Sequence, residues 1–242
     1  MKVLALDSSG LVASVAIVED DGVNSTLLAE YTVNYKKTHS QTLLPMLDQM
    51  VEMIELDKST VDAIAVSAGP GSFTGLRIGS ATAKGLGLAW NVPLISVPTL
   101  DALAYNLYGT DKLVCPIMDA RRNQVYTGVY SWEMNEMVTL KEPCAVSIEE
   151  LAAYLNETGR DVIFLGDGVP VYKEMLKDLL KVQYSFAPVH LSRQRAGAVA
   201  SLAMKLYAEG KYESAAEHQP EYLRLSQAER ERKEKETGNG AV

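Results

Sequence analysis

Residues 69–79, GPGSFTGLRIG, are the part of the sequence best suited to hold a ligand. Gly69, Gly71 and Gly75 permit positive φ angles and a close approach of backbone amides. A predicted helix follows, and its N-terminus would direct a partial positive charge into the loop. The segment matches neither GxGxxG nor the Walker pattern. Two interpretations stay open: a phosphate-binding loop with Gly69 and Gly71 as candidate ligands, and a tight strand-to-helix turn.

Asp7 ends the first predicted strand and is followed by Ser8 and Ser9. Actin-like and sugar-kinase-like proteins place a carboxylate here, near nucleotide phosphate or metal. An aspartate before two serines also forms an ordinary turn that hydrogen-bonds to itself. Asp7 and Ser8 are therefore candidate nucleotide-binding residues, with the self-bonded turn as the alternative.

The histidines and cysteines form no recognised catalytic pattern. His39, His190 and His218 are the three histidines, and no two are four residues apart, as paired metal ligands on a helix would be. Cys115 and Cys144 lack CxxC spacing, so we expect buried thiols. No GxSxG elbow occurs. The sequence therefore predicts neither catalytic residues nor a metal site.

Composition and charge exclude several protein classes. Apolar residues make up 47% of the chain and charged residues 22%, which is the balance of a globular protein. The formal net charge is −8, from 23 basic and 31 acidic residues, which argues against strong direct RNA binding. No apolar run approaches the roughly 18 residues of a membrane span, and no secretory signal begins the chain. We expect a cytoplasmic protein without membrane contact.

Hydrophobic periodicity predicts the order β-β-β-α-β-α at the start of the chain, and then a second set of similar elements. The run 61–68 is almost continuously apolar, which suits a strand buried on both faces. Predicted strands lie at 2–7, 12–18, 28–35, 61–68, 93–97, 113–118, 124–132, 138–147 and 162–165. Predicted helices lie at 40–54, 75–90, 99–108, 148–156, 171–180 and 194–210.

These elements divide into two α/β domains, which we expect at 1–105 and 106–225. Residues 226–242 mix both charge signs with almost no apolar content, so they cannot bury enough surface to order themselves. We expect a disordered charged tail there.

The second predicted helix has a face of small residues. Gly75, Gly79, Ala83 and Gly87 recur every four positions and so line one side. Each interior glycine costs a helix about 1 kcal/mol relative to alanine, so this face must pack closely against a neighbour. Spacing leaves open whether that neighbour belongs to this chain or to another.

Several motifs together resemble the TsaB family, whose members partner TsaD in bacterial tRNA threonylcarbamoyladenosine biosynthesis. GPGSFTGLRIG is the most specific, and the others follow in the family's order. The motifs are LALDSS at 4–9, HSQTLLP at 39–45, IAVSAGPGSFTGLRIG at 64–79, AKGLGLA at 83–89, DARRNQVY at 119–126, GDG at 166–168 and PEYLR at 220–224.

The resemblance implies a duplicated α/β fold of the actin-like and sugar-kinase-like (ASKHA) type. It also implies a non-catalytic scaffold that pairs with the catalytic paralogue TsaD. The ATPase TsaE joins this assembly, and tRNA is bound only indirectly, through the complex. TsaD-type proteins carry an HxxxH metal motif on the first helix. Here Leu43 stands four positions after His39, so the metal role does not carry over.

The resemblance places the partner interface on the two N-terminal helices, within 40–56 and 75–90. A homodimer through the same helices and ATP at a complex interface stay open. Two other functions compete: an ATP-binding, ATP-hydrolysing or glycopeptidase-like enzyme of the same fold, and direct tRNA binding through Arg121 and Arg122. The expected interface residues are Leu43, Leu47, Met50, Gly75, Gly79, Ala83 and Gly87.

Overall fold

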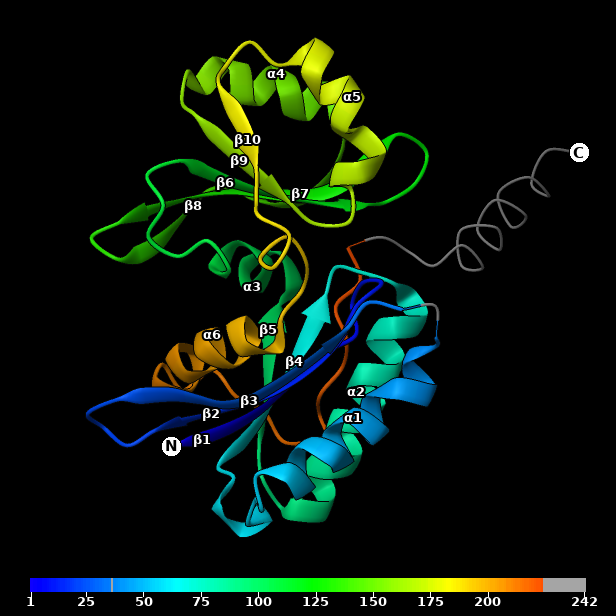
Figure 1. Cartoon of the computed structure of the whole chain (residues 1–242), viewed down its shortest axis with the longest axis vertical. Coiled ribbons are helices and arrows are strands. Elements are labelled where there is room, and N and C mark those ends of the chain that lie inside the picture. The colour runs from blue at the N-terminus through cyan, green and yellow to red at the C-terminus, as the bar shows by residue number, and fades with distance from the viewer. Residues whose placement is uncertain (36, 224–242) are drawn as a thin grey trace, which may run out of the picture.

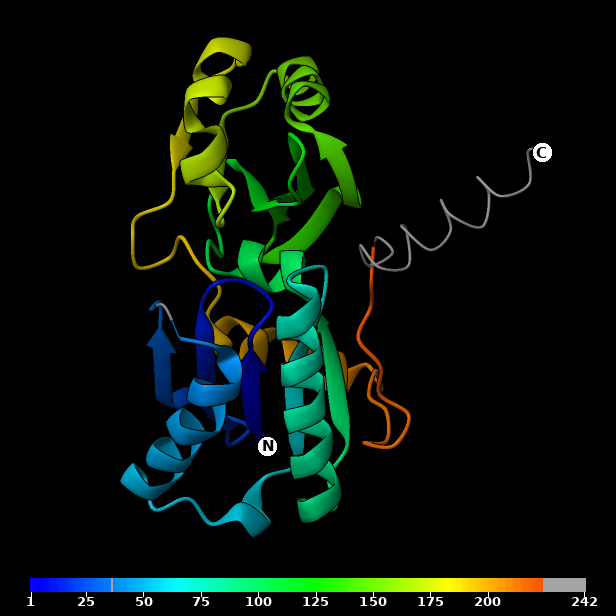
Figure 2. The same ribbon diagram turned by 90° about the vertical axis from the view of Figure 1, so that its right-hand side faces the viewer.

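Two five-stranded sheets, each with its own helices, form the framework of the described chain (Figure 1). The computed structural model describes residues 1–35 and 37–223. Turning the molecule shows the two α/β units stacked along its long axis (Figure 2).

The first sheet contains β1 (Lys2–Asp7), β2 (Ala13–Asp20), β3 (Ser25–Val33), β4 (Ala63–Gly69) and β5 (Leu94–Pro98). The second contains β6 (Leu113–Asp119), β7 (Gln124–Glu133), β8 (Glu136–Ser147), β9 (Val162–Leu165) and β10 (Tyr184–Phe186). The helices are α1 (His39–Met53), α2 (Phe73–Trp90), α3 (Thr99–Tyr105), α4 (Ile148–Thr158), α5 (Val169–Leu179) and α6 (Ala196–Ala208), with a short 3-10 turn at Lys58–Thr60.

The second sheet repeats the topology of the first. The sheet orders are β3-β2-β1-β4-β5 and β10-β9-β6-β7-β8. In each sheet the first three strands pair antiparallel, and the other two are added parallel on the far side of the first strand. Because this mixed order occurs twice, the predicted duplicated α/β fold of the actin-like and sugar-kinase-like type is confirmed.

Strand β4, between β1 and β5, is buried on both faces, as its continuous apolar sequence predicts. Ile64 and Val66 contribute to the core under α1 and α2, whereas Ala63 and Ala65 contribute to the core under α6. Successive strand side chains point to opposite faces, so one apolar run serves two layers of helices.

Helix α6 covers the first sheet, although it follows the second in sequence (Figure 1). Its first backbone amides are anchored there, because Ala196 N donates to Ser14 Oγ at 2.9 Å and Gly197 N donates to Glu30 Oε1 at 2.9 Å. The expected division into 1–105 and 106–225 is therefore wrong for this part of the chain. Helical spacing identifies an apolar stripe but not the sheet that the stripe covers.

After α6 the chain runs along α2 to the glycine-rich loop. Glu213 forms an isolated antiparallel bridge with Leu94 at the edge of β5. Lys84 Nζ donates to the carbonyl oxygens of Ala216 and His218, both at 3.0 Å. This segment therefore also belongs to the first unit. The predicted tail, 226–242, lies outside the described residues.

Smaller differences concern short or exposed features. The prediction lacked β10 and the 3-10 turn, because segments of three residues carry little periodicity. Cys115 is buried as expected, and burial raises the pKa of its thiol to about 12, whereas Cys144 is only partly buried. None of the helices in the described part of the chain has the length and apolar character needed to cross a membrane.

Candidate functional site

The Asp7 carboxylate is buried and bonded to its own chain. Oδ1 accepts hydrogen bonds from Ser9 N at 2.9 Å and Ser9 Oγ at 2.7 Å, and Oδ2 accepts one from Ser67 Oγ at 2.5 Å. Burial raises the pKa of Asp7, and these hydrogen bonds and the nearby His39 offset part of that rise. Asp7 therefore forms the self-bonded turn that the sequence left open as the alternative.

The glycine-rich loop packs against the turn that follows Asp7. A β-carbon at Gly71 or Gly75 would collide with the carbonyl oxygen of Ser9 or Ser8, respectively. Ser72 N donates to Ser9 O at 2.7 Å, which ties the two loops together. The glycines thus let the backbone at the start of α2 approach the backbone of Ser8 and Ser9 closely. In this structure the loop is the tight strand-to-helix turn that the sequence left open.

Gly69 is in the left-handed region, with φ +137°, and a β-carbon there would collide with Glu221 O. The segment that returns along α2 therefore closes the other side of the loop. Glu221 N also donates to Ala68 O at 2.7 Å. Backbone of this chain fills the space on both sides of the candidate phosphate loop.

The small-residue face of α2 packs inside this chain. A β-carbon at Gly79 would meet Ser8 Oγ and Val66, and one at Gly87 would meet Leu94. Spacing alone could not identify this neighbour, because it shows only that a face needs close packing. The residues expected at a partner interface are consequently buried within the chain, which corrects that expectation for Leu43, Leu47, Met50, Gly75, Gly79, Ala83 and Gly87.

A second small-residue row lies on the outward side of α2. Ala81, Gly85 and Ala89 are exposed at the same four-residue spacing, and no other segment of residues 1–35 and 37–223 lies within 4 Å of a β-carbon built at Gly85. Leu88 beside them is 64% exposed. The four-residue spacing of small residues that identifies the inner row also identifies this outer row. The sequence alone could therefore have located both rows.

Helix α1 lies beside α2 on the same side of the sheet and adds exposed apolar groups (Figure 1). Leu44 is 53% exposed and Met53 is 74% exposed, but nine positions of separation place their side chains on opposite sides of α1. The exposed side of α2 carries small and apolar residues at helical spacing and is here called the outer helix face. It comprises Thr74, Ala81, Gly85, Leu88 and Ala89.

The three histidines are dispersed. His39 Nε2 contacts Gly10 O at 2.8 Å, and His190 is exposed. His218 is buried, with Nδ1 2.8 Å from Glu213 Oε1. Among residues 1–35 and 37–223, no three His, Cys, Asp or Glu side chains are grouped so that they could hold a metal ion.

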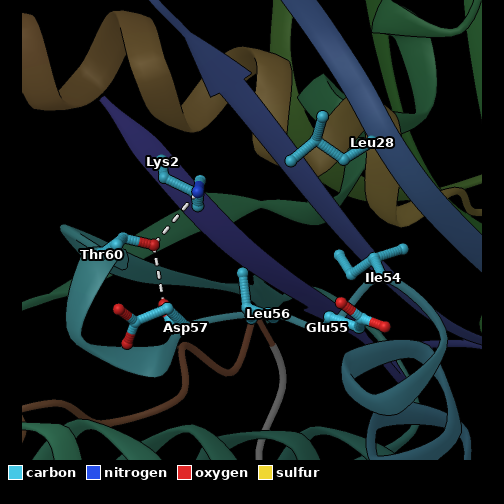
Figure 3. A pocket seen from close by; sticks show the side chains of 7 residues that line it. All are labelled: Lys2, Leu28, Ile54, Glu55, Leu56, Asp57 and Thr60. Carbon is cyan, nitrogen blue, oxygen red and sulfur yellow. Dashed lines mark hydrogen bonds between the residues drawn. The ribbon is translucent and has the colours of Figure 1, made fainter.

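A pocket of about 400 Å³ includes Lys2, the first residue of β1, in its lining (Figure 3). Asp7 ends the same strand, so the pocket lies at the other end of β1 from Asp7. Lys2 Nζ reaches across it and donates to Thr60 Oγ1 at 3.1 Å. The pocket therefore joins none of the residues predicted to bind a ligand. Its lining consists of Lys2, Leu28, Ile54, Glu55, Leu56, Asp57 and Thr60.

Comparisons with known proteins agree with the fold. The family model for TsaD, tRNA N6-adenosine threonylcarbamoyltransferase, matches residues 26–232. A solved structure from Pseudomonas aeruginosa, described as an uncharacterized protein with similarity to peptidase YEAZ, superposes with a TM-score of 0.77 at 29% identity. That match covers 92% of this chain and 99% of the other.

Several relatives carry the name tRNA threonylcarbamoyladenosine biosynthesis protein TsaB. The Bacillus subtilis protein is 33% identical, over 95% of this chain and 96% of its own length. The Escherichia coli protein is 29% identical, over 93% of this chain and 95% of its own length. The duplicated fold, the motifs and this nearly full-length similarity agree, and the chain belongs to the TsaB family of tRNA threonylcarbamoyladenosine biosynthesis proteins.

Proposed function

We propose that this protein is a non-catalytic scaffold subunit in tRNA threonylcarbamoyladenosine formation and that it pairs with a TsaD-like catalytic subunit through the outer helix face. A TsaE-like ATPase completes the assembly, and tRNA is bound by the assembled complex. The single observation that carries the proposal is Gly85, an exposed glycine in the middle of α2, where a β-carbon would meet no other segment of the described residues within 4 Å.

Gly85 differs from the inner glycines of the same helix. An interior glycine costs about 1 kcal/mol relative to alanine, and packing inside the chain accounts for Gly79 and Gly87. Within the described residues nothing similar accounts for Gly85. A helix of a partner, brought close to the backbone at Ala81 and Gly85, would do so.

The apolar residues around Gly85 support the same surface. Leu88, about one turn after Gly85 on the same side of α2, is 64% exposed. Exposed apolar groups gathered on one face are typical of protein interaction sites. The outer helix face therefore combines close backbone approach with apolar area that association would bury.

The scaffold role is supported by the state of the candidate ligand-binding residues. Asp7 is bonded to Ser9 and Ser67, and the loop at Gly69 and Gly71 is packed on both sides by backbone. An ATP-binding or glycopeptidase-like enzyme is the alternative. Saturable ATP binding or peptide hydrolysis by the isolated protein, lost on a substitution in this chain, would support that alternative and contradict the scaffold.

Two arginine substitutions on different helices test the interface. Ala81→Arg lies on the outer helix face, and Ala153→Arg on α4 is a matched exposed control. Both should melt like the parent to within about 1 kcal/mol, because exposed substitutions are usually mild. Only Ala81→Arg should weaken binding to a TsaD-like subunit, by about a hundredfold or more, since a cation would enter an apolar contact. Equal binding by both variants would reject this interface, and a homodimer would appear as self-association lost in Ala81→Arg.

A further inference from the structure

The β6–β7 connection holds three successive residues in the left-handed backbone region. The φ angles are +61° at Arg121, +55° at Arg122 and +57° at Asn123. Side chains with a β-carbon adopt this conformation at an energetic cost, which asparagine tolerates better than arginine. Two arginines are therefore held where glycine would be easier, and such backbone strain persists only where its surroundings enforce it.

Hydrogen bonds at the base of the connection enforce that conformation. Asp119 Oδ1 accepts from Arg121 N at 2.8 Å. Tyr172 OH, from α5, donates to the same oxygen at 3.1 Å and lies 3.2 Å from Gln124 O. Asp119 N donates to Asp167 Oδ1 at 3.2 Å. The base is therefore clamped by backbone amides, two carboxylates and a phenol, and it makes no use of the arginine side chains.

Both guanidinium groups face solvent above this clamp. Arg121 and Arg122 are exposed, and neither guanidinium has a hydrogen-bond or ion-pair partner within residues 1–35 and 37–223. Arg195 differs, because its guanidinium is paired with Glu30. The rigid base thus presents two adjacent cations, which we call the arginine tip.

We propose that the arginine tip contacts phosphate groups of the tRNA backbone in the assembled complex, an inference that rests on the proposed function. A guanidinium offers a planar fork of donors that matches phosphate oxygens, and a clamped loop loses little freedom on binding. The net charge of −8 gives this chain no general attraction for RNA. Any contribution of this chain to tRNA binding therefore has to come from a local group of exposed cations, such as Arg121 and Arg122. An acidic protein surface is the competing ligand, which the experiment separates.

The test uses Arg121→Gly/Arg122→Gly in complex with a TsaD-like subunit, with an unmodified tRNA transcript as the probe. Glycine suits the left-handed backbone, so the variant should melt at or above the parent temperature. The complex should bind tRNA about tenfold or more weakly at 0.1 M salt. The slope of log K against log salt should fall by about one to two, as expected for losing one or two phosphate contacts.

Two control variants sharpen the experiment. Arg160→Ala removes an exposed arginine at the opposite end of the second sheet and should leave affinity and slope unchanged. Arg122→Lys keeps the charge but loses the fork, so it should keep the salt slope and bind with intermediate affinity. A lower melting temperature of the double glycine variant would indicate that the arginines only hold the hairpin, and would overturn the proposal.

Assembly is measured by sedimentation on the same samples before tRNA is added. Parent-like tRNA affinity and salt slope in an assembled double variant would overturn the RNA contact. Loss of assembly in the double glycine variant would show that the arginine tip contacts a partner protein, and would also overturn the RNA contact. Failure of the parent chain itself to assemble would instead overturn the proposed function, and the RNA contact with it.

Discussion

Asp7 and Asp119 occupy equivalent positions in the two halves of the fold and form the same turn. Each ends the first strand of its sheet, and each Oδ1 accepts a hydrogen bond from the backbone N two residues later, from Ser9 at 2.9 Å and from Arg121 at 2.8 Å. The surroundings then differ, because Asp7 is buried under the start of α2 whereas Asp119 is exposed at a hairpin. The same turn is therefore buried against α2 in the first unit and lies in an exposed hairpin loop in the second.

The inner face of α2 should not tolerate a charge. Ala83 is fully buried in the core shared with α1 and β4, so Ala83→Arg would place an unpaired cation there. We expect a loss of about 3–5 kcal/mol in the free energy of unfolding. Melting followed by circular dichroism checks this, with Ala81→Arg two positions away as the exposed control. Parent-like melting of Ala83→Arg would contradict the packing of this face inside the chain.

Glycine-to-alanine changes within α2 should have opposite effects. At Gly75 the new β-carbon would collide with Ser8 O, so Gly75→Ala should destabilise the protein by about 1–3 kcal/mol. At Gly85 the β-carbon has open space, so Gly85→Ala should stabilise the free protein by up to about 1 kcal/mol. Urea unfolding of the two variants measures both signs. Equal shifts would show that the contact between α2 and the Ser8 turn is not close.

Asp7 should make stability depend on pH. Burial raises its folded pKa above 3.8, so its contribution favours the folded state at low pH and is lost as the pH rises through the folded value. Asp7→Asn keeps an acceptor for Ser9 but cannot ionise. The variant should therefore gain stability relative to the parent as the pH rises above 3.8. Urea unfolding over that range tests it, and a difference that does not change with pH would refute the assignment.

Glu30 should be important for the attachment of α6. Its carboxylate accepts from Gly197 N and pairs with Arg195, and its side chain is only 6% exposed. Glu30→Ala leaves these groups without a partner and should cost about 1–3 kcal/mol. Glu136 pairs with Lys205 on the same helix but is 74% exposed, so Glu136→Ala should cost less than about 1 kcal/mol. Thermal melting compares them, and equal losses would contradict a special role for Glu30.

Local patterns in the sequence determined most elements and the class of fold. The apolar run at 61–68 predicted β4, because a strand buried on both faces needs apolar side chains on each. The repeated order of elements predicted two similar sheets. The glycines at 69–75 marked a place of close backbone approach, which lies where the prediction put it.

Only the tertiary structure decided what each of these features contacts. It placed α6 on the first sheet, turned Gly79 and Ala83 inward and left Gly85 outward, and it packed the Asp7 turn against α2. It also set Arg121 and Arg122 in a clamped left-handed loop. Spacing along a chain fixes which side chains share a face, because that follows from helix and strand geometry. Which surface covers that face depends on where distant segments return, and local spacing carries no information about that.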